Sequence, residues 1–358
     1  MNQDSSINTT QLTFGNRFEP GVNHPIESSN FAPALRHPVG TFSVYSLPPN
    51  IQENVTAGVQ IVPVRNMPLA QSFDARQKWP GLISGPLDQE RCGSCWAFST
   101  SSVLSDRLRI TNPNDRQLRT MFEYRPNDEQ GITESYPLIN NVSPYQLVSC
   151  DLCNTVGTSL HPIGQDTLCN KGCSGGVIAD AFDYLVHRGA NSILATNPVP
   201  SNPSNPNTFR CDFNPQDPVY RASTKYIVAQ IGLLGDTRGP SIRERCIKEE
   251  VFLHGPVSAA YTVYRSFYTF FEQNPRGIYG ITPQPANDTI VGGHAIVIIG
   301  WGGEGENRYW LVRNSWGERW GDGGYFRIKY DWHPPNASDS NNHHTIGIMD
   351  EVWAVSTS

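Results

Sequence analysis

The sequence lacks three features, and each absence counts against a class of protein. No apolar run is long enough to cross a bilayer, which argues against a membrane span. The net charge is -6 and no cluster of Lys or Arg is present, so nucleic acid is not an expected partner. Residues 1–30 contain no charged start followed by an apolar segment, so no secretory signal is recognised.

What remains is a chain of 358 residues, 38% hydrophobic and 17% charged, which can build a substantial core in one or two lobes. Residues 1–68 differ from the rest. They are polar, rich in Pro, Asn and Ser, and contain no cysteine. We expect a separate N-terminal segment, with a disordered tail as the alternative, followed by a folded domain over residues 69–358.

Residues 89–99 place a thiol where a helix is expected to begin. Gly93 and Ser94 supply the turn and the cap before Cys95. Apolar residues at three-to-four spacing then predict a helix that buries one face: Trp96, Ala97, Val103, Leu104 and Leu108. The N–H groups and positive dipole of the first turn favour the thiolate form of Cys95, which is the nucleophilic form.

A thiolate nucleophile needs a cationic partner that can also protonate a leaving amine, and histidine serves both needs near neutral pH. His294 follows two glycines and opens the β-branched run 295–299, a predicted buried strand. A second predicted strand ends at Asn314, which can orient an imidazole. The other histidines lie in polar, Pro-rich or helix-end contexts that favour solvated or capping roles: His24, His37, His161, His187, His254, His333, His343 and His344.

Gln89, Cys95, His294 and Asn314, in this order and with these flanks, resemble the papain family of cysteine proteases. His294 and Asn314 follow Cys95 by 199 and 219 residues, against about 130 to 150 in that family, so insertions are expected between the two halves. The segments Ser72–Pro80 and Leu104–Arg107 are similar to cathepsin B-like members. The likeness covers about residues 70–355.

Cys92 and Cys95 also form a Cys-x-x-Cys pair, which elsewhere indicates a redox dithiol or half of a zinc site. A redox centre requires a βαβ unit around the pair, and a zinc site requires a second pair about 15 to 20 residues later. The next cysteine, Cys150, comes 55 residues after Cys95. Both readings stay as minor alternatives to the protease interpretation.

The resemblance implies an α+β, papain-like fold with two lobes and an active site in the cleft between them. We expect a helical lobe over about 69–190, a lobe with an antiparallel, barrel-like sheet over about 191–345, and a C-terminal segment that returns to the cleft. The sequence pattern itself predicts a helix near 174–188 and strands near 256–264, 293–301, 307–313 and 324–330.

The resemblance also assigns roles, with no metal and no cofactor. Cys95 is the expected nucleophile, His294 the acid and base, and Asn314 its orienting partner, while Gln89 stabilises the oxyanion. Expected substrate contacts are Gly175, Gly176, Gly293, Trp316 and Glu351. The opposing hypothesis is a catalytically inactive papain-like module that serves in binding or adhesion.

Eight cysteines minus one nucleophile leave an odd number. By resemblance, the expected disulfides are Cys92–Cys173, Cys150–Cys211 and Cys153–Cys169. Cys246 is left over and is predicted to be an inert buried thiol near a helix start. Disulfides suggest a lysosomal, secreted or particle-associated setting, which the absent signal does not support, so the compartment is left open.

The resemblance further implies protein or peptide substrates, a monomer, and inhibition by residues 1–68 until cleavage near residues 60–72. Residues 191–210 stand where cathepsin B-like exopeptidases carry an inserted loop with a histidine pair. That stretch contains neither histidine nor cysteine before Cys211. We therefore expect an endopeptidase rather than a carboxydipeptidase.

Overall fold

The computed structural model describes residues 60–90, 92–115, 117–118, 141–151, 170–173, 175–196, 211–230, 240–280, 288–330 and 347–357. Within these ranges, no helix combines the length and apolar character needed to traverse a bilayer.

Six α-helices and two 3-10 turns lie in the described ranges. The helices are α2 (Ala75–Lys78), α3 (Cys95–Thr111), α5 (Pro144–Cys150), α6 (Ile178–His187), α7 (Pro240–His254) and α8 (Arg265–Gln273), and the turns are η4 (Ile193–Ala195) and η6 (Gly305–Asn307). The strands are β1 (Gln60–Ile61), β2 (Phe73–Asp74), β3 (Ala190–Asn191), β4 (Val219–Tyr220), β5 (Thr224–Gln230), β6 (Val257–Tyr264), β7 (Ile278–Tyr279), β8 (Ile290–Gly302), β9 (Tyr309–Arg313), β10 (Tyr325–Lys329) and β11 (Glu351–Ser356).

The four strands predicted from sequence all form, each within a few residues of its expected bounds, as β6, β8, β9 and β10. They join a nine-stranded sheet in the order β1-β5-β11-β6-β8-β9-β10-β7, with β2 attached to β8. The sheet differs from the expected antiparallel barrel. Two ladders, β1 with β5 and β10 with β7, are parallel, and the described strands follow an open path rather than a closed one.

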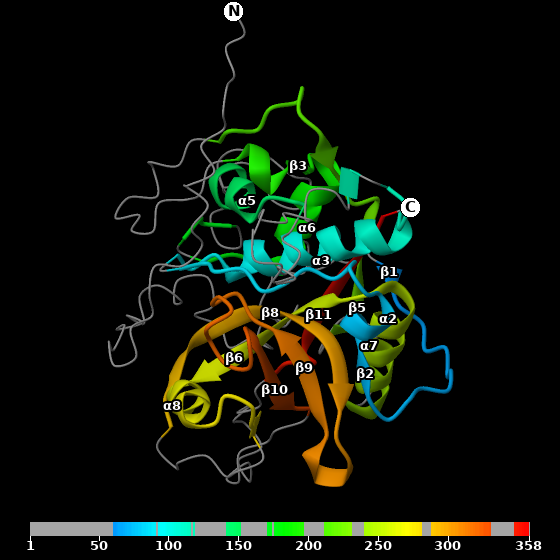
Figure 1. Ribbon diagram of the computed structural model, residues 1–358, viewed down its shortest axis with the longest axis vertical. Helices are drawn as coiled ribbons and strands as arrows, with labels where there is room; N and C mark the ends of the chain where they lie inside the picture. The colour runs from blue at the N-terminus through cyan, green and yellow to red at the C-terminus, as the bar shows by residue number, and fades with distance from the viewer. Residues whose placement is uncertain are drawn as a thin grey trace, which may run out of the picture.

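Helix α3 lies between this sheet and the helices α5 and α6 (Figure 1). Alternate residues of β8 face opposite sides: Ala295, Val297 and Ile299 pack in one core with α3 and α6, whereas Ile296 and Ile298 pack in a second core with α7 and α8. Cys95 stands at the first turn of α3, so this central helix brings its N-terminus to the edge where both layers meet.

The amphipathic pattern of α3 underestimates how deeply the helix is buried. Nearly the whole helix is inaccessible to solvent, including Asp106, Arg107 and Arg109, while Leu108, which the pattern assigns to the core, is partly exposed. Polar residues can occupy the second face because each finds a partner in the surrounding structure.

Arg107 is the main link from α3 to the sheet side. Its guanidinium donates hydrogen bonds to the carbonyl oxygens of Gly255, Pro256 and Val355 at 2.9–3.0 Å, and it pairs with Glu250 of α7 at 3.1 Å. One side chain thereby joins α3 to the segment before β6, to β11 and to α7.

Asp106 forms the second link. Its carboxylate accepts hydrogen bonds from Ser84 through both N–H and hydroxyl, each at 2.7 Å. It also pairs with Arg109 of α3 and with Arg313 at the end of β9, both at 2.9 Å. Because Arg313 directly precedes Asn314, this ion pair fixes Asn314 relative to the helix that carries Cys95.

Residues 60–71, which we call the strap, run along the outer side of α7. β1 extends the main sheet, and Val62 N–H donates to Ile227 at 3.0 Å. The N–H groups of Arg65 and Met67 both donate to the buried carboxylate of Glu249, at 2.8 and 3.0 Å. Sequence analysis assigns most of these residues to the N-terminal segment, yet here they pair with the folded domain.

Removal of the Asp106 carboxylate is expected to destabilise the fold strongly. Asp106→Ala leaves Arg109 and Arg313 buried without their anion, which we expect to cost about 3–5 kcal/mol in the free energy of unfolding. The control is Asp322→Ala, since Asp322 pairs with Arg276 and Arg327 at the surface and should cost below about 1 kcal/mol. Urea denaturation measures both, and equal losses would contradict the role given to Asp106.

Candidate active site

Cys95 occupies the first turn of α3, as the sequence predicts, but its sulfur is buried. The N–H groups of Ala295, Trp96 and Cys95 itself point at the sulfur and favour the thiolate. Burial outweighs them and raises the pKa of Cys95 to about 11. Ser94 stands at the N-cap position without the side-chain capping bond that sequence analysis expects. The helix terminus alone therefore does not ionise this thiol.

His294 lies within β8 rather than at its start and is fully buried. Its Nε2 lies 2.7 Å from Oδ1 of Asn314, and the Ser315 N–H donates to the same oxygen at 2.9 Å. An amide oxygen only accepts, so Nε2 must carry the proton and Nδ1 must be the basic nitrogen of the neutral ring. Burial lowers the pKa of His294 to about 4, partly opposed by the Asn314 contact.

Trp316 covers the His294–Asn314 contact. Its ring stacks on the imidazole with centroids 4.7 Å apart and planes inclined by 27°. Trp316 is itself buried, so it keeps water from the hydrogen bond between His294 and Asn314.

Gln89 is buried beside the same loop. Its side-chain nitrogen donates to the Cys92 carbonyl at 2.8 Å, and its side-chain oxygen accepts from the Ser315 hydroxyl at 2.5 Å. These two bonds fix the orientation of the Gln89 amide, with its nitrogen toward the loop before α3 and its oxygen toward Ser315. Sequence reasoning missed Ser315, whose only signal was its place next to Asn314.

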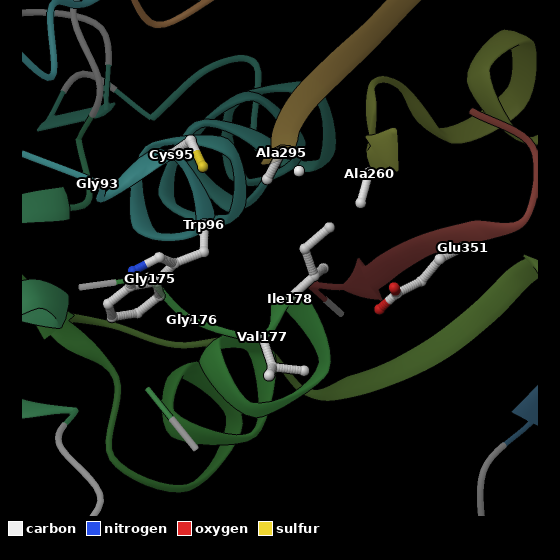
Figure 2. Close-up of a pocket in the computed structure, with 11 residues that line it drawn as sticks. Gly93, Cys95, Trp96, Gly175, Gly176, Val177, Ile178, Ala260, Ala295 and Glu351 are labelled. Carbon is white, nitrogen blue, oxygen red and sulfur yellow. The ribbon is translucent and has the colours of Figure 1, made fainter. Parts of the chain in front are cut away.

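A small pocket opens beside Cys95, between α3, α6 and the sheet (Figure 2). Its lining includes four of the five residues expected to contact substrate, Gly175, Gly176, Gly293 and Glu351, whereas Trp316 is not part of it. Gly176 is required sterically, because a Cβ there would lie 2.5 Å from the Trp96 ring and 2.4 Å from Asn170.

Glu351 stands at the start of β11, with its carboxylate directed into the pocket (Figure 2). Burial raises its pKa to about 7, a hydrogen bond from the Trp353 indole lowers it, and the charge of Asp180 raises it. The carboxyl group therefore changes charge near neutral pH.

Two disulfides lie in the described ranges, Cys92–Cys173 and Cys150–Cys211. The first joins the loop before Cys95 to the loop that leads into Gly175. The third expected pair, Cys153 and Cys169, lies outside the described residues. Cys246 is buried in α7, six residues after this helix begins at Pro240, in agreement with the expectation of a buried thiol near a helix start.

No group of three or more His, Cys, Asp or Glu side chains with the arrangement of a metal site is found in the part of the chain that the structure describes.

Comparison with known proteins places this chain in a family. The profile of the family described as "Papain family cysteine protease" matches residues 69–121 and 130–351. The chain is 30% identical over 280 residues to "Cathepsin B-like cysteine proteinase 3" of Caenorhabditis elegans, covering 73% of this chain and 62% of that protein. It is 32% identical over 285 residues to "Cathepsin B-like cysteine proteinase" of Schistosoma japonicum, covering 74% of this chain and 69% of that protein.

A relative with a different name also matches. "Tubulointerstitial nephritis antigen-like" of Rattus norvegicus is 29% identical over 294 residues, covering 73% of this chain and 51% of that protein. Among solved structures, "proCathepsin B S9 from Trypanosoma congolense" has a TM-score of 0.56 at 24% identity, covering 85% of this chain and 84% of its own. The fold is therefore papain-like, and the chain belongs to the papain family of cysteine proteases.

Proposed function

We propose that this protein is a cysteine endopeptidase that hydrolyses peptide bonds through a thioester on Cys95. The observation that carries the proposal is the joint placement of Cys95 and β8. The sulfur faces the Ala295 N–H, and the preceding residue, His294, has its basic nitrogen set by Asn314 and Ser315. An inactive binding module has no need of this arrangement.

In this mechanism, Nδ1 of His294 accepts the thiol proton as the sulfur attacks the substrate carbonyl. The Gln89 side chain and the Cys95 N–H stabilise the oxyanion, at about 3 kcal/mol per donor. His294 then protonates the leaving amine, and water hydrolyses the thioester with His294 as base. Asn314 holds the ring throughout, and Trp316 excludes solvent from that contact.

The N-terminal segment is proposed to inhibit the enzyme until it is cleaved. The support is that the solved structure with a similar fold is named as a procathepsin. Because the strap pairs with the main sheet, a chain that begins at residue 60 is the shortened form best matched to the folded domain.

The first test is titration of the thiol with an epoxide inactivator, using the full chain and the chain that begins at residue 60. We expect one labelled site, lost in Cys95→Ala and retained in Cys246→Ala, the matched control for a buried thiol. Labelling should rise as pH increases through about 4, where His294 loses its proton and becomes able to accept one from Cys95. His294→Ala should slow labelling at pH 7 by about a hundredfold or more.

Absence of labelling in both forms would favour the inactive binding module. Labelling that survives in Cys95→Ala would show that the epoxide reacts with a cysteine other than Cys95.

The second prediction concerns the substrate residue two positions before the scissile bond. Ionised Glu351 offers an Arg side chain a bidentate partner, whereas the protonated form suits Leu or Phe. Because its pKa is raised to about 7, the preference for Arg over Leu should increase by about tenfold or more between pH 5 and pH 8. The ratio of kcat/KM for paired substrates measures it, and a pH trend that persists in Glu351→Gln would refute the assignment.

The third prediction separates endopeptidase from carboxydipeptidase activity. A free substrate carboxylate needs a donor or cation, and residues 191–210 supply no histidine, although 197–210 lie outside the described residues. We expect a peptide with a free carboxyl terminus and its amidated twin to be cut at the same internal bonds. Mass spectrometry reads the products, and stepwise release of dipeptides from the free form alone would overturn the expectation.

A further inference from the structure

Two tyrosines flank the His294–Trp316 stack. Tyr261 of β6 is the direct cross-strand partner of His294, and its ring meets the imidazole edge-on with centroids 5.9 Å apart. Tyr268 of α8 stacks on Trp316, with the ring centroids 5.5 Å apart and the ring planes inclined by 14°. Tyr261 is thereby held against the residue proposed to transfer protons, and Tyr268 against the ring that covers it.

The hydroxyls of Tyr261 and Tyr268 are buried, and neither has a hydrogen-bond partner among the residues that the structure describes. The nearby Tyr279 differs, because its hydroxyl is 2.8 Å from the Ser266 hydroxyl. A buried hydroxyl without a partner destabilises a fold, so two of them beside one reactive thiol call for a ligand.

Both hydroxyls also lie within electrostatic reach of the Cys95 sulfur. Burial raises the pKa of Tyr261 and of Tyr268, and in each case the Cys95 charge contributes to the rise. The pKa of Tyr279 is also raised by burial, but Cys95 is not among its causes. Tyr261 and Tyr268 therefore stay protonated and can both donate and accept hydrogen bonds.

Tyr261 and Tyr268 lie away from the pocket that would hold the acyl part of a substrate. The pocket with Gly176 and Glu351 lies beside Cys95 and would hold the acyl part of a substrate. Tyr268 stacks on Trp316, which in turn stacks on His294, and neither Tyr268 nor Trp316 lines that pocket. We therefore place the departing amine on this side of His294. A water molecule that follows the amine would enter between the two hydroxyls.

We propose that Tyr261 and Tyr268 bind the water that hydrolyses the thioester; this rests on the proposed function. The water donates one hydrogen to His294 and the other to one tyrosine oxygen, accepts a bond from the second tyrosine, and directs its remaining lone pair at the carbonyl carbon. A C–O bond forms and the C–S bond breaks. The proton taken by His294 passes to the sulfur, which regenerates the thiol.

The test is how the acyl-enzyme partitions between water and an added amine. An ester substrate is supplied with an amino-acid amide, using the form of the enzyme in which the epoxide labels Cys95, and both products are quantified by mass spectrometry. In Tyr261→Phe and Tyr268→Phe, we expect the ratio of transfer product to hydrolysis product to rise about tenfold. Acyl-enzyme should accumulate in a burst, and the unfolding temperature should not fall.

Tyr330→Phe is the matched control. The Tyr330 hydroxyl is also buried in the same core without a hydrogen-bond partner in the described ranges, but Cys95 does not contribute to its pKa. The control should leave the ratio unchanged. Lower activity with an unchanged ratio in Tyr261→Phe and Tyr268→Phe would overturn the water site and leave the protease intact. Failure of the wild type to form any acyl-enzyme would instead remove the proposed function itself.

Discussion

The ion pair between Asp106 and Arg313 is the constraint on which the site depends. It joins α3, which presents Cys95, to the strand whose next residue is Asn314. Neither the thiol nor the imidazole could keep its alignment if the helix slid along the sheet. Arg107 acts in parallel by holding three carbonyl oxygens from two further segments, so the position of α3 is fixed by directional bonds as well as by apolar packing.

Sequence alone could predict the four main strands and could single out Cys95, His294 and Asn314 as candidate side chains, because both signals are local. The thiol opens a periodic helix, a β-branched run marks β8, and Gly-rich turns separate the strands. It could not predict the burial of all sides of α3, because the partners of Asp106 and Arg107 lie up to 248 residues away. For the same reason it missed Ser315, the open course of the sheet, and the burial that raises the pKa of Cys95 instead of lowering it.

The buried polar groups fall into two kinds. Asp106 and Arg107 are surrounded by donors and acceptors and hold the structure together. Cys95, His294 and Glu351 instead have pKa values displaced by burial. Cys95 and Glu351 line the same pocket, and His294 directly follows Gly293 of its lining. The groups that stabilise the fold, Asp106 and Arg107, are thus separate from the groups whose charged forms are poorly solvated. This separation is expected where groups must change charge during a reaction.

The strap has a consequence in kinetic terms. A chain severed just after Met67 would still hold its upstream piece, through the pairing of β1 with β5 and the two N–H groups bound by Glu249. Cleavage of the chain and dissociation of the upstream piece would then be separate events with separate rate constants. While it stays bound, the severed end remains at a high local concentration next to the domain, so the off-rate of a short strand, rather than the speed of cutting, would set the lifetime of the nicked complex.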